Sequence, residues 1–150
     1  MNRADKAVDL FKEGYNCAQA VAMAFSEELD MTPAAVARMA SSFGGGMGRM
    51  REVCGAVSGM LLVAGILYGY DTCEDDAVKK EHYALVQYLA GQFREKMGSI
   101  VCRELLENPP SDPAPTPRTA EFYQKRPCAR MVYLAAKIME EYLAEHPTNG

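Results

Sequence analysis

The stretch from Val53 to Tyr70 is almost continuously apolar, and Ser58 is its one clearly polar side chain. Glycine interrupts it at positions 55, 59, 65 and 69. A helix that is apolar on every side must be buried, either in a membrane or among other helices. The stretch is slightly shorter than the roughly 20 residues that span a bilayer, and the segments around it carry apolar stripes of their own that need a partner. We therefore expect a central glycine-rich helix surrounded by other helices.

Apolar residues recur at steps of three and four on both sides of this run, which is typical of amphipathic helices. The predicted helices span residues 5–28, 33–42, 76–97, 100–106 and 127–145. Thr32 is expected to cap the second of these, Asp75 or Asp76 the third, and Ser99 the fourth, while Gly98 ends the third. No segment alternates between apolar and polar residues as a half-buried strand does. The sequence predicts an all-α fold, a compact bundle of about five to six helices around the central one.

Two segments are expected to be loops. Residues 43–48 contain four glycines, which permit backbone conformations closed to other residues. Residues 108–118 contain five prolines, which forbid regular structure. The chain has the usual length of one domain, and the helix after the prolines is too short to fold alone. We therefore predict a single domain over residues 1–150, with the proline-rich loop 108–118 as an excursion within it.

Charge and the N-terminal sequence exclude several functions. The formal net charge is −4, and no cluster of Lys or Arg offers a surface to phosphate backbones, so nucleic-acid binding is not expected. The first residues run directly into an amphipathic pattern, without the apolar core of a signal peptide. We expect a cytoplasmic protein. In a reducing cytosol its five cysteines favour thiol chemistry, metal binding or burial over structural disulfides.

Three cysteines lie at or near predicted helix starts, namely Cys54, Cys102 and Cys128. The amide groups and partial positive charge of a helix start favour the thiolate over the thiol, and the thiolate is the nucleophile and the metal ligand. Several arginines lie close to these cysteines in sequence and add positive charge. Cys73 differs, because the acidic residues around it oppose a thiolate. Cys54 is the expected centre of any chemistry.

Glycines mark two places where a ligand or cofactor could approach closely. Gly45 and Gly46 lie in the glycine-rich loop, where successive amides followed by Arg49 and Arg51 could cradle an anion. Gly55 and Gly59 stand four residues apart, so one helix face beside Cys54 presents almost no side chain. A partner helix packed against that face explains the same glycines equally well.

These residues carry a resemblance to a known family. The run Cys54-Gly55-Ala56-Val57-Ser58-Gly59, with the glycine-rich loop before it, resembles the CGAxxG signature of the redox-active C_GCAxxG_C_C family. Cys17 in Tyr15-Asn16-Cys17-Ala18-Gln19 is similar to that family's early cysteine, and Cys102 and Cys128 match the later two in order. The resemblance implies a small helical protein with a redox function. It transfers the role of redox or ligand residue to Cys17, Cys54, Cys102 and Cys128, and leaves Cys73 outside the pattern.

Three functions fit this set of cysteines. In the first, a Cys54 thiolate attacks a disulfide or oxidant, and Cys17, Cys102 or Cys128 resolves the adduct, so that the partner is a redox protein or a small thiol or disulfide. In the second, the four cysteines bind zinc or an iron–sulfur cluster, although metal ligands are usually closer in sequence. In the third, the protein is a non-catalytic helical binding module and its cysteines are core residues. An enzyme of the first kind would have thiol–disulfide oxidoreductase-like activity.

Overall fold

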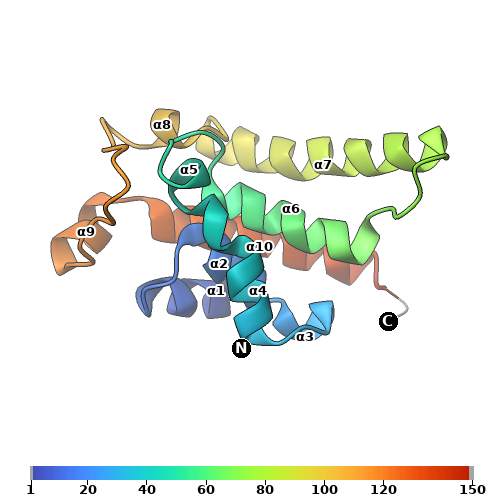
Figure 1. The fold of residues 1–150 in the computed structure, drawn as a ribbon, viewed down its shortest axis with the longest axis horizontal. Helices are drawn as coiled ribbons and strands as arrows, with labels where there is room; N and C mark the ends of the chain where they lie inside the picture. Colours follow the sequence, from blue (N-terminus) through green and yellow to red (C-terminus); the bar gives the residue numbers. More distant parts are fainter. Residues whose placement is uncertain (1, 149–150) are drawn as a thin grey trace.

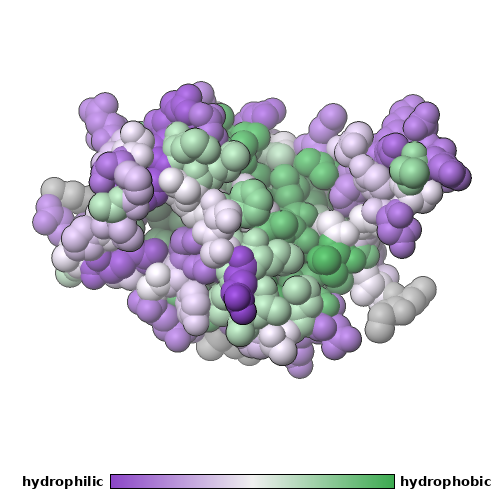
Figure 2. Space-filling view, in the orientation of Figure 1, coloured by the Kyte–Doolittle hydropathy of each residue, from purple (hydrophilic) through white to green (hydrophobic). Residues whose placement is uncertain are grey.

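Helix α6 (Gly55–Tyr68) forms from the apolar run and lies between α2 (Cys17–Met23), α7 (Asp76–Met97) and α10 (Cys128–Glu145) (Figure 1). The computed structural model describes residues 2–148, without the side chain of Lys125. Most of α6 up to Ala64 is buried, whereas Ile66 near its end is 53% exposed. Apolar residues gather over this middle part of the molecule, and polar residues cover its two ends (Figure 2). The central helix and the all-α class are confirmed.

No strand forms within residues 2–148, where an isolated antiparallel bridge joins Val53 to Val101. In the same range, every helix is too short or too polar to cross a membrane.

The N-terminal segment is broken, so the prediction of one helix over residues 5–28 is wrong. Three helices occupy it: α1 (Arg3–Lys12), α2 and α3 (Ser26–Leu29). The chain turns at Gly14, whose φ of 117° lies in the region that favours glycine. It restarts at Asn16, which forms a capping box with Gln19. Apolar periodicity continues across the break because α1 and α2 bury their apolar faces in one core.

The next elements follow the sequence closely. Helix α4 (Pro33–Ala40) starts after Thr32, whose hydroxyl accepts a hydrogen bond from the amide of Ala35. A single 3-10 turn, η1 (Ser41–Phe43), leads from it into the glycine-rich loop. Asp75 caps α7 and Gly98 ends it in a left-handed conformation, as predicted.

The glycine-rich loop closes into one turn, α5 (Gly44–Met47), but this turn is not a right-handed helix. Residues 45–49 all have a positive φ, and Arg51 joins them with 62°. Glycine adopts this conformation freely, whereas each other residue costs about 1–2 kcal/mol. The amides of Arg51 and Glu52 donate to the carbonyls of Gly45 and Gly46, which holds the turn closed.

Helix α8 (Cys102–Leu105) begins later than predicted. Ser99 does not cap it, because its hydroxyl accepts from the amide of Val101 one residue before the helix. The proline-rich loop is confirmed, and a short helix that the sequence did not predict, α9 (Ala120–Lys125), follows it. The predicted last helix, α10, starts at Cys128 after Pro127.

Glycines of α6 let α2 approach unusually closely. A Cβ atom at position 59 would lie 2.6 Å from the carbonyl oxygen of Ala18, and one at position 55 would lie 3.2 Å from the Ala18 amide nitrogen. Both partners are backbone atoms, which cannot rotate away as a side chain can. This close packing fixes Cys17, the first residue of α2, against the first residue of α6.

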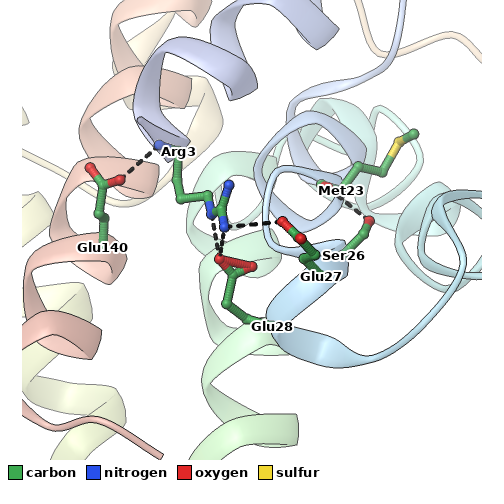
Figure 3. A network of polar contacts seen from close by, with 6 residues as sticks. All are labelled: Arg3, Met23, Ser26, Glu27, Glu28 and Glu140. Carbon is green, nitrogen blue, oxygen red and sulfur yellow. Dashed lines mark hydrogen bonds and ion pairs between the residues drawn. The ribbon is translucent and has the colours of Figure 1, made fainter. Parts of the chain in front are cut away.

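A polar network ties the N-terminal helix α1 to α3 and α10 (Figure 3). The Arg3 guanidinium pairs with Glu28 and lies 3.5 Å from a carboxylate oxygen of Glu27, both on α3. The amide of Arg3 donates to Glu140 of α10 over 2.7 Å. The hydroxyl of Ser26 donates to the carbonyl of Met23 and secures the join between α2 and α3. These contacts hold α1 against α10.

Replacing Gly59 by alanine tests the close packing. We expect Gly59→Ala to lower the free energy of unfolding by about 1–3 kcal/mol, because its methyl group would displace the α2 backbone. The matched control is Gly91→Ala in the middle of α7, where a Cβ atom meets nothing within 4 Å. That change should stabilise the protein by about 0.5–1 kcal/mol through helix propensity. Urea unfolding measures both, and equal effects would show that α2 does not lie on the glycine face.

Candidate functional site

All four cysteines of the predicted set lie at helix starts. Cys17, Cys102 and Cys128 are the first residues of α2, α8 and α10, and Cys54 caps α6. Helices α6 and α10 begin at the end of the molecule that carries α5 and α9, on the left of Figure 1. The sequence predicted this position for three of the four cysteines. It missed Cys17, because the break at Gly14 was not recognised.

The structure separates these cysteines into one direct pair and two single residues. The side chains of Cys17 and Cys128 interact through a hydrogen bond that shifts their pKa values in opposite directions. The Cys54 sulfur lies 3.9 Å from the Met131 sulfur, in the core. The Cys102 sulfur lies 3.7 Å from Nη1 of the buried Arg51. Negative charge at Cys102 or Cys128 raises the pKa of Cys54, and negative charge at Cys54 raises the pKa of Cys17. The four cysteines are therefore close enough to interact electrostatically.

The pKa of Cys128 is lowered, whereas the pKa values of Cys17 and Cys54 are raised. The hydrogen bond from Cys17 lowers the pKa of Cys128 to about 7, and the charges of Arg126, Arg118 and Arg51 act in the same direction against burial. The same hydrogen bond, together with burial, raises the pKa of Cys17 well above its ordinary value. Burial raises the pKa of Cys54 to about 12. Near neutral pH these pKa values favour a thiolate at Cys128 over one at Cys54, and the role of Cys54 as the centre of the chemistry stays a prediction.

Cys17 and Cys128 line a cavity of about 310 Å³. Its wall comes from α1, α2, the glycine-rich loop, the proline-rich loop and α9, so residues far apart in the sequence meet there. Four arginines contribute to the wall: Arg49, Arg51, Arg118 and Arg126. Among the described residues that line it, none is acidic. The thiolate of Cys128 therefore faces a positively charged cavity.

Neutral backbone groups hold most of these guanidinium groups in place. Arg49 donates to the carbonyl of Asp112 and to the hydroxyl of Thr116, over 2.7 and 2.9 Å. Arg51 donates to the carbonyl of Pro110 over 2.9 Å. The proline-rich loop thus covers the glycine-rich loop and forms one wall of the cavity. The left-handed turn of residues 45–51 directs both arginines to this wall.

Arg118 anchors the other side of the cavity. It donates to the carbonyls of Phe11 and Tyr15 over 2.9 and 3.0 Å, and its guanidinium lies 4.4 Å from the ring centre of Phe11. Sequence reasoning missed Arg118, because nothing in its local sequence shows that the proline-rich loop returns to α1. Arg126 was noticed only as charge close to a cysteine in sequence, whereas Arg49 and Arg51 were also noticed beside the glycine-rich loop that could cradle an anion.

The four predicted cofactor-binding glycines occupy two kinds of place. Gly45 lines the cavity. Cβ atoms at Gly46, Gly55 and Gly59 would meet protein atoms at 2.6–2.9 Å, from the following loop, η1 and α2. The face formed by Gly55 and Gly59 is therefore filled by α2, as the packing alternative expected. Gly45 stays a candidate for ligand contact.

Two further predictions concern metal binding and the position of Cys73. Within the described residues, no group of three or more His, Cys, Asp and Glu side chains is arranged to hold a metal ion. A four-cysteine zinc or iron–sulfur site stays a prediction. Cys73 is exposed in the turn before α7, outside the cavity.

A family model described as "Putative redox-active protein (C_GCAxxG_C_C)" matches residues 15–142. No curated protein and no solved structure matches the chain.

Alkylation tests the assignment of the thiolate. We expect the rate of iodoacetamide labelling at Cys128 to rise through about pH 7 and then level off, because the thiolate is the reactive form. Cys17→Ala removes the hydrogen bond and should move this midpoint to higher pH. Cys54 should stay unlabelled in the native protein. Peptide mass spectrometry follows each site, and protein unfolded in guanidinium controls for access. Labelling of Cys54 before Cys128 would contradict the assignment.

Proposed function

The chain belongs to the C_GCAxxG_C_C family, whose description is redox-active, and from this premise we propose that Cys17 and Cys128 carry out thiol–disulfide exchange. One observation carries the proposal: a hydrogen bond joins Cys17 and Cys128, and both line the same cavity. A nucleophilic thiolate beside a second thiol is the arrangement that this exchange requires.

The two cysteines take different roles in the reaction. The Cys128 thiolate attacks one sulfur of a disulfide R–S–S–R′, which forms a Cys128–S–S–R bond and releases R′–S⁻. Cys17 then gives up its proton to the released thiolate and attacks the Cys128 sulfur. This step forms the Cys17–Cys128 disulfide and releases R–S⁻. The protein is oxidised by two electrons and the substrate is reduced to two thiols, and a dithiol reductant returns the protein to its starting state.

The acidities of the thiols support this division of roles. An attacking thiol is most effective when its pKa is near the ambient pH, and Cys128 meets this condition. Cys17 keeps its proton until the first step is complete, because its pKa is raised by the hydrogen bond to Cys128 and by burial. Loss of the Cys128 negative charge in the mixed disulfide removes that hydrogen bond and makes Cys17 easier to deprotonate.

Cys54 and Cys102 support the pair without reacting in this proposal. Like Cys128 they are buried, but neither of them lines the cavity. Cys54 packs on Met131 one turn after Cys128 on α10, so it positions the start of that helix. The proposal includes a reducing compartment such as the cytoplasm, because both reacting thiols must be available in reduced form.

A trapping experiment tests the proposal against a purely structural role of the cysteines. All proteins carry Cys73→Ser, which removes the exposed thiol. One equivalent of 4,4′-dithiodipyridine should release two thiopyridones from this protein and leave no adduct, because Cys17 resolves the mixed disulfide. With Cys17→Ser it should release one thiopyridone and leave a stable adduct on Cys128, which mass spectrometry detects.

Two controls make the result decisive. Cys54→Ala, which alters a buried cysteine outside the cavity, should keep the release of two thiopyridones. Cys128→Ser should slow the first release strongly, because the remaining cavity thiol is protonated. If Cys17→Ser still released two thiopyridones, or if Cys128→Ser reacted as fast as its parent, the proposed pair would be wrong.

A further inference from the structure

Arg51 is the feature of the cavity that the exchange reaction leaves unexplained. Its side chain is a charged group in the core, and the residue is only 5% exposed. Nε donates to the carbonyl of Pro110 and Nη1 faces the Cys102 sulfur. Nη2 is buried and has no hydrogen-bond partner in the described part of the chain. A buried charged donor without an acceptor is costly, so its presence beside a cavity indicates a ligand that supplies the acceptor.

The surrounding charges indicate that this ligand is negatively charged. Three further arginines line the same cavity, and one of them, Arg49, lies 3.7 Å from the largely exposed carboxylate of Asp112. Arg118 is bonded to neutral carbonyl groups, which do not cancel its charge. Several guanidinium groups that converge on a small cavity bind anions, because each offers fixed N–H donors and positive charge.

The size and the remaining wall of the cavity limit the ligand further. A volume of about 310 Å³ is at the small end of the range for ligand sites. Phe11, Phe122 and two prolines give the wall an apolar part. The cavity therefore suits a small molecule with an anionic group and a short apolar stem.

We propose that this cavity binds the anionic group of the disulfide substrate, so that Cys128 reacts with small disulfides that carry a carboxylate or similar anion close to the sulfur. This inference rests on the proposed exchange reaction and names its substrate class. Arg51 positions the substrate by donating a hydrogen bond from Nη2 to its anion, and Arg118 and Arg126 line the same cavity. Binding of the anion places the disulfide against Cys128, at which the bonds form and break as described above.

A comparison between an anionic and a neutral aromatic disulfide tests this specificity. The rate at Cys128 is measured with 5,5′-dithiobis(2-nitrobenzoate), which carries two carboxylates, and with neutral 4,4′-dithiodipyridine, in the Cys73→Ser protein. Each rate is divided by the rate of the same reagent with free cysteine, which removes intrinsic reactivity. We expect a preference of about tenfold or more for the anionic reagent, as one charge-assisted contact supplies.

Two variants with the same change in net charge separate the cavity from general electrostatics. Arg51→Gln should abolish most of the preference, whereas Arg38→Gln on the exposed side of α4 should keep it. Because Arg51 is buried and Arg51→Gln could fail to fold, sulfate provides a second test on the unaltered cavity. At constant ionic strength, sulfate in place of chloride should slow the anionic reagent more than the neutral one.

The outcomes distinguish the two proposals. If Cys128 reacts with both reagents, with no preference and no effect of sulfate, the anion site is wrong and thiol–disulfide exchange stands. If Cys128 reacts with neither reagent, exchange itself is wrong.

Discussion

The close approach of α2 to the glycine face of α6 determines where the reactive sulfurs lie. Because Gly55 and Gly59 lack side chains, the backbone of Ala18 reaches α6 directly, and the Cβ atom of Cys17 lies 3.3 Å from the place where a Cβ of Gly55 would be. Helix α10 packs on both α2 and α6 and begins with Cys128. The CGAxxG glycines therefore act through packing: they bring Cys17 to the start of α10.

Burial and hydrogen bonding then give chemically identical side chains different properties. At Cys54 burial outweighs the hydrogen bonds from the backbone of Ala56 and Val57, so the pKa of its thiol rises. Cys128 receives a hydrogen bond and the field of nearby arginines, so its pKa falls. This field comes from Arg126 at the end of α9, Arg118 in the proline-rich loop and Arg51, which that loop holds by the carbonyl of Pro110. The helices place the sulfurs, and in the proposed reaction these arginines make Cys128 the attacking thiol.

Sequence reasoning succeeded where a local signal was sufficient. The Asp75 cap, the Gly98 stop and the central apolar helix depend on neighbouring residues, and each was predicted. The break at Gly14 was missed, because the apolar pattern continues through it. The resemblance singled out four cysteines as a set, but only tertiary contacts show that Cys17 lies beside Cys128 and that Arg118 lines the same cavity. The roles of the site residues and the single-domain organisation stay predictions.

The central claim is that the reactive sulfurs are those of Cys17 and Cys128, and peptide mapping of mildly oxidised protein tests it most directly. Reduced protein is treated with one equivalent of diamide, the remaining thiols are blocked, and the linked peptides are identified by mass spectrometry. The account predicts one intramolecular disulfide, between Cys17 and Cys128, with Cys54 and Cys102 recovered as blocked thiols. A disulfide that contains Cys54 or Cys102 instead, or no intramolecular disulfide at all, would contradict it.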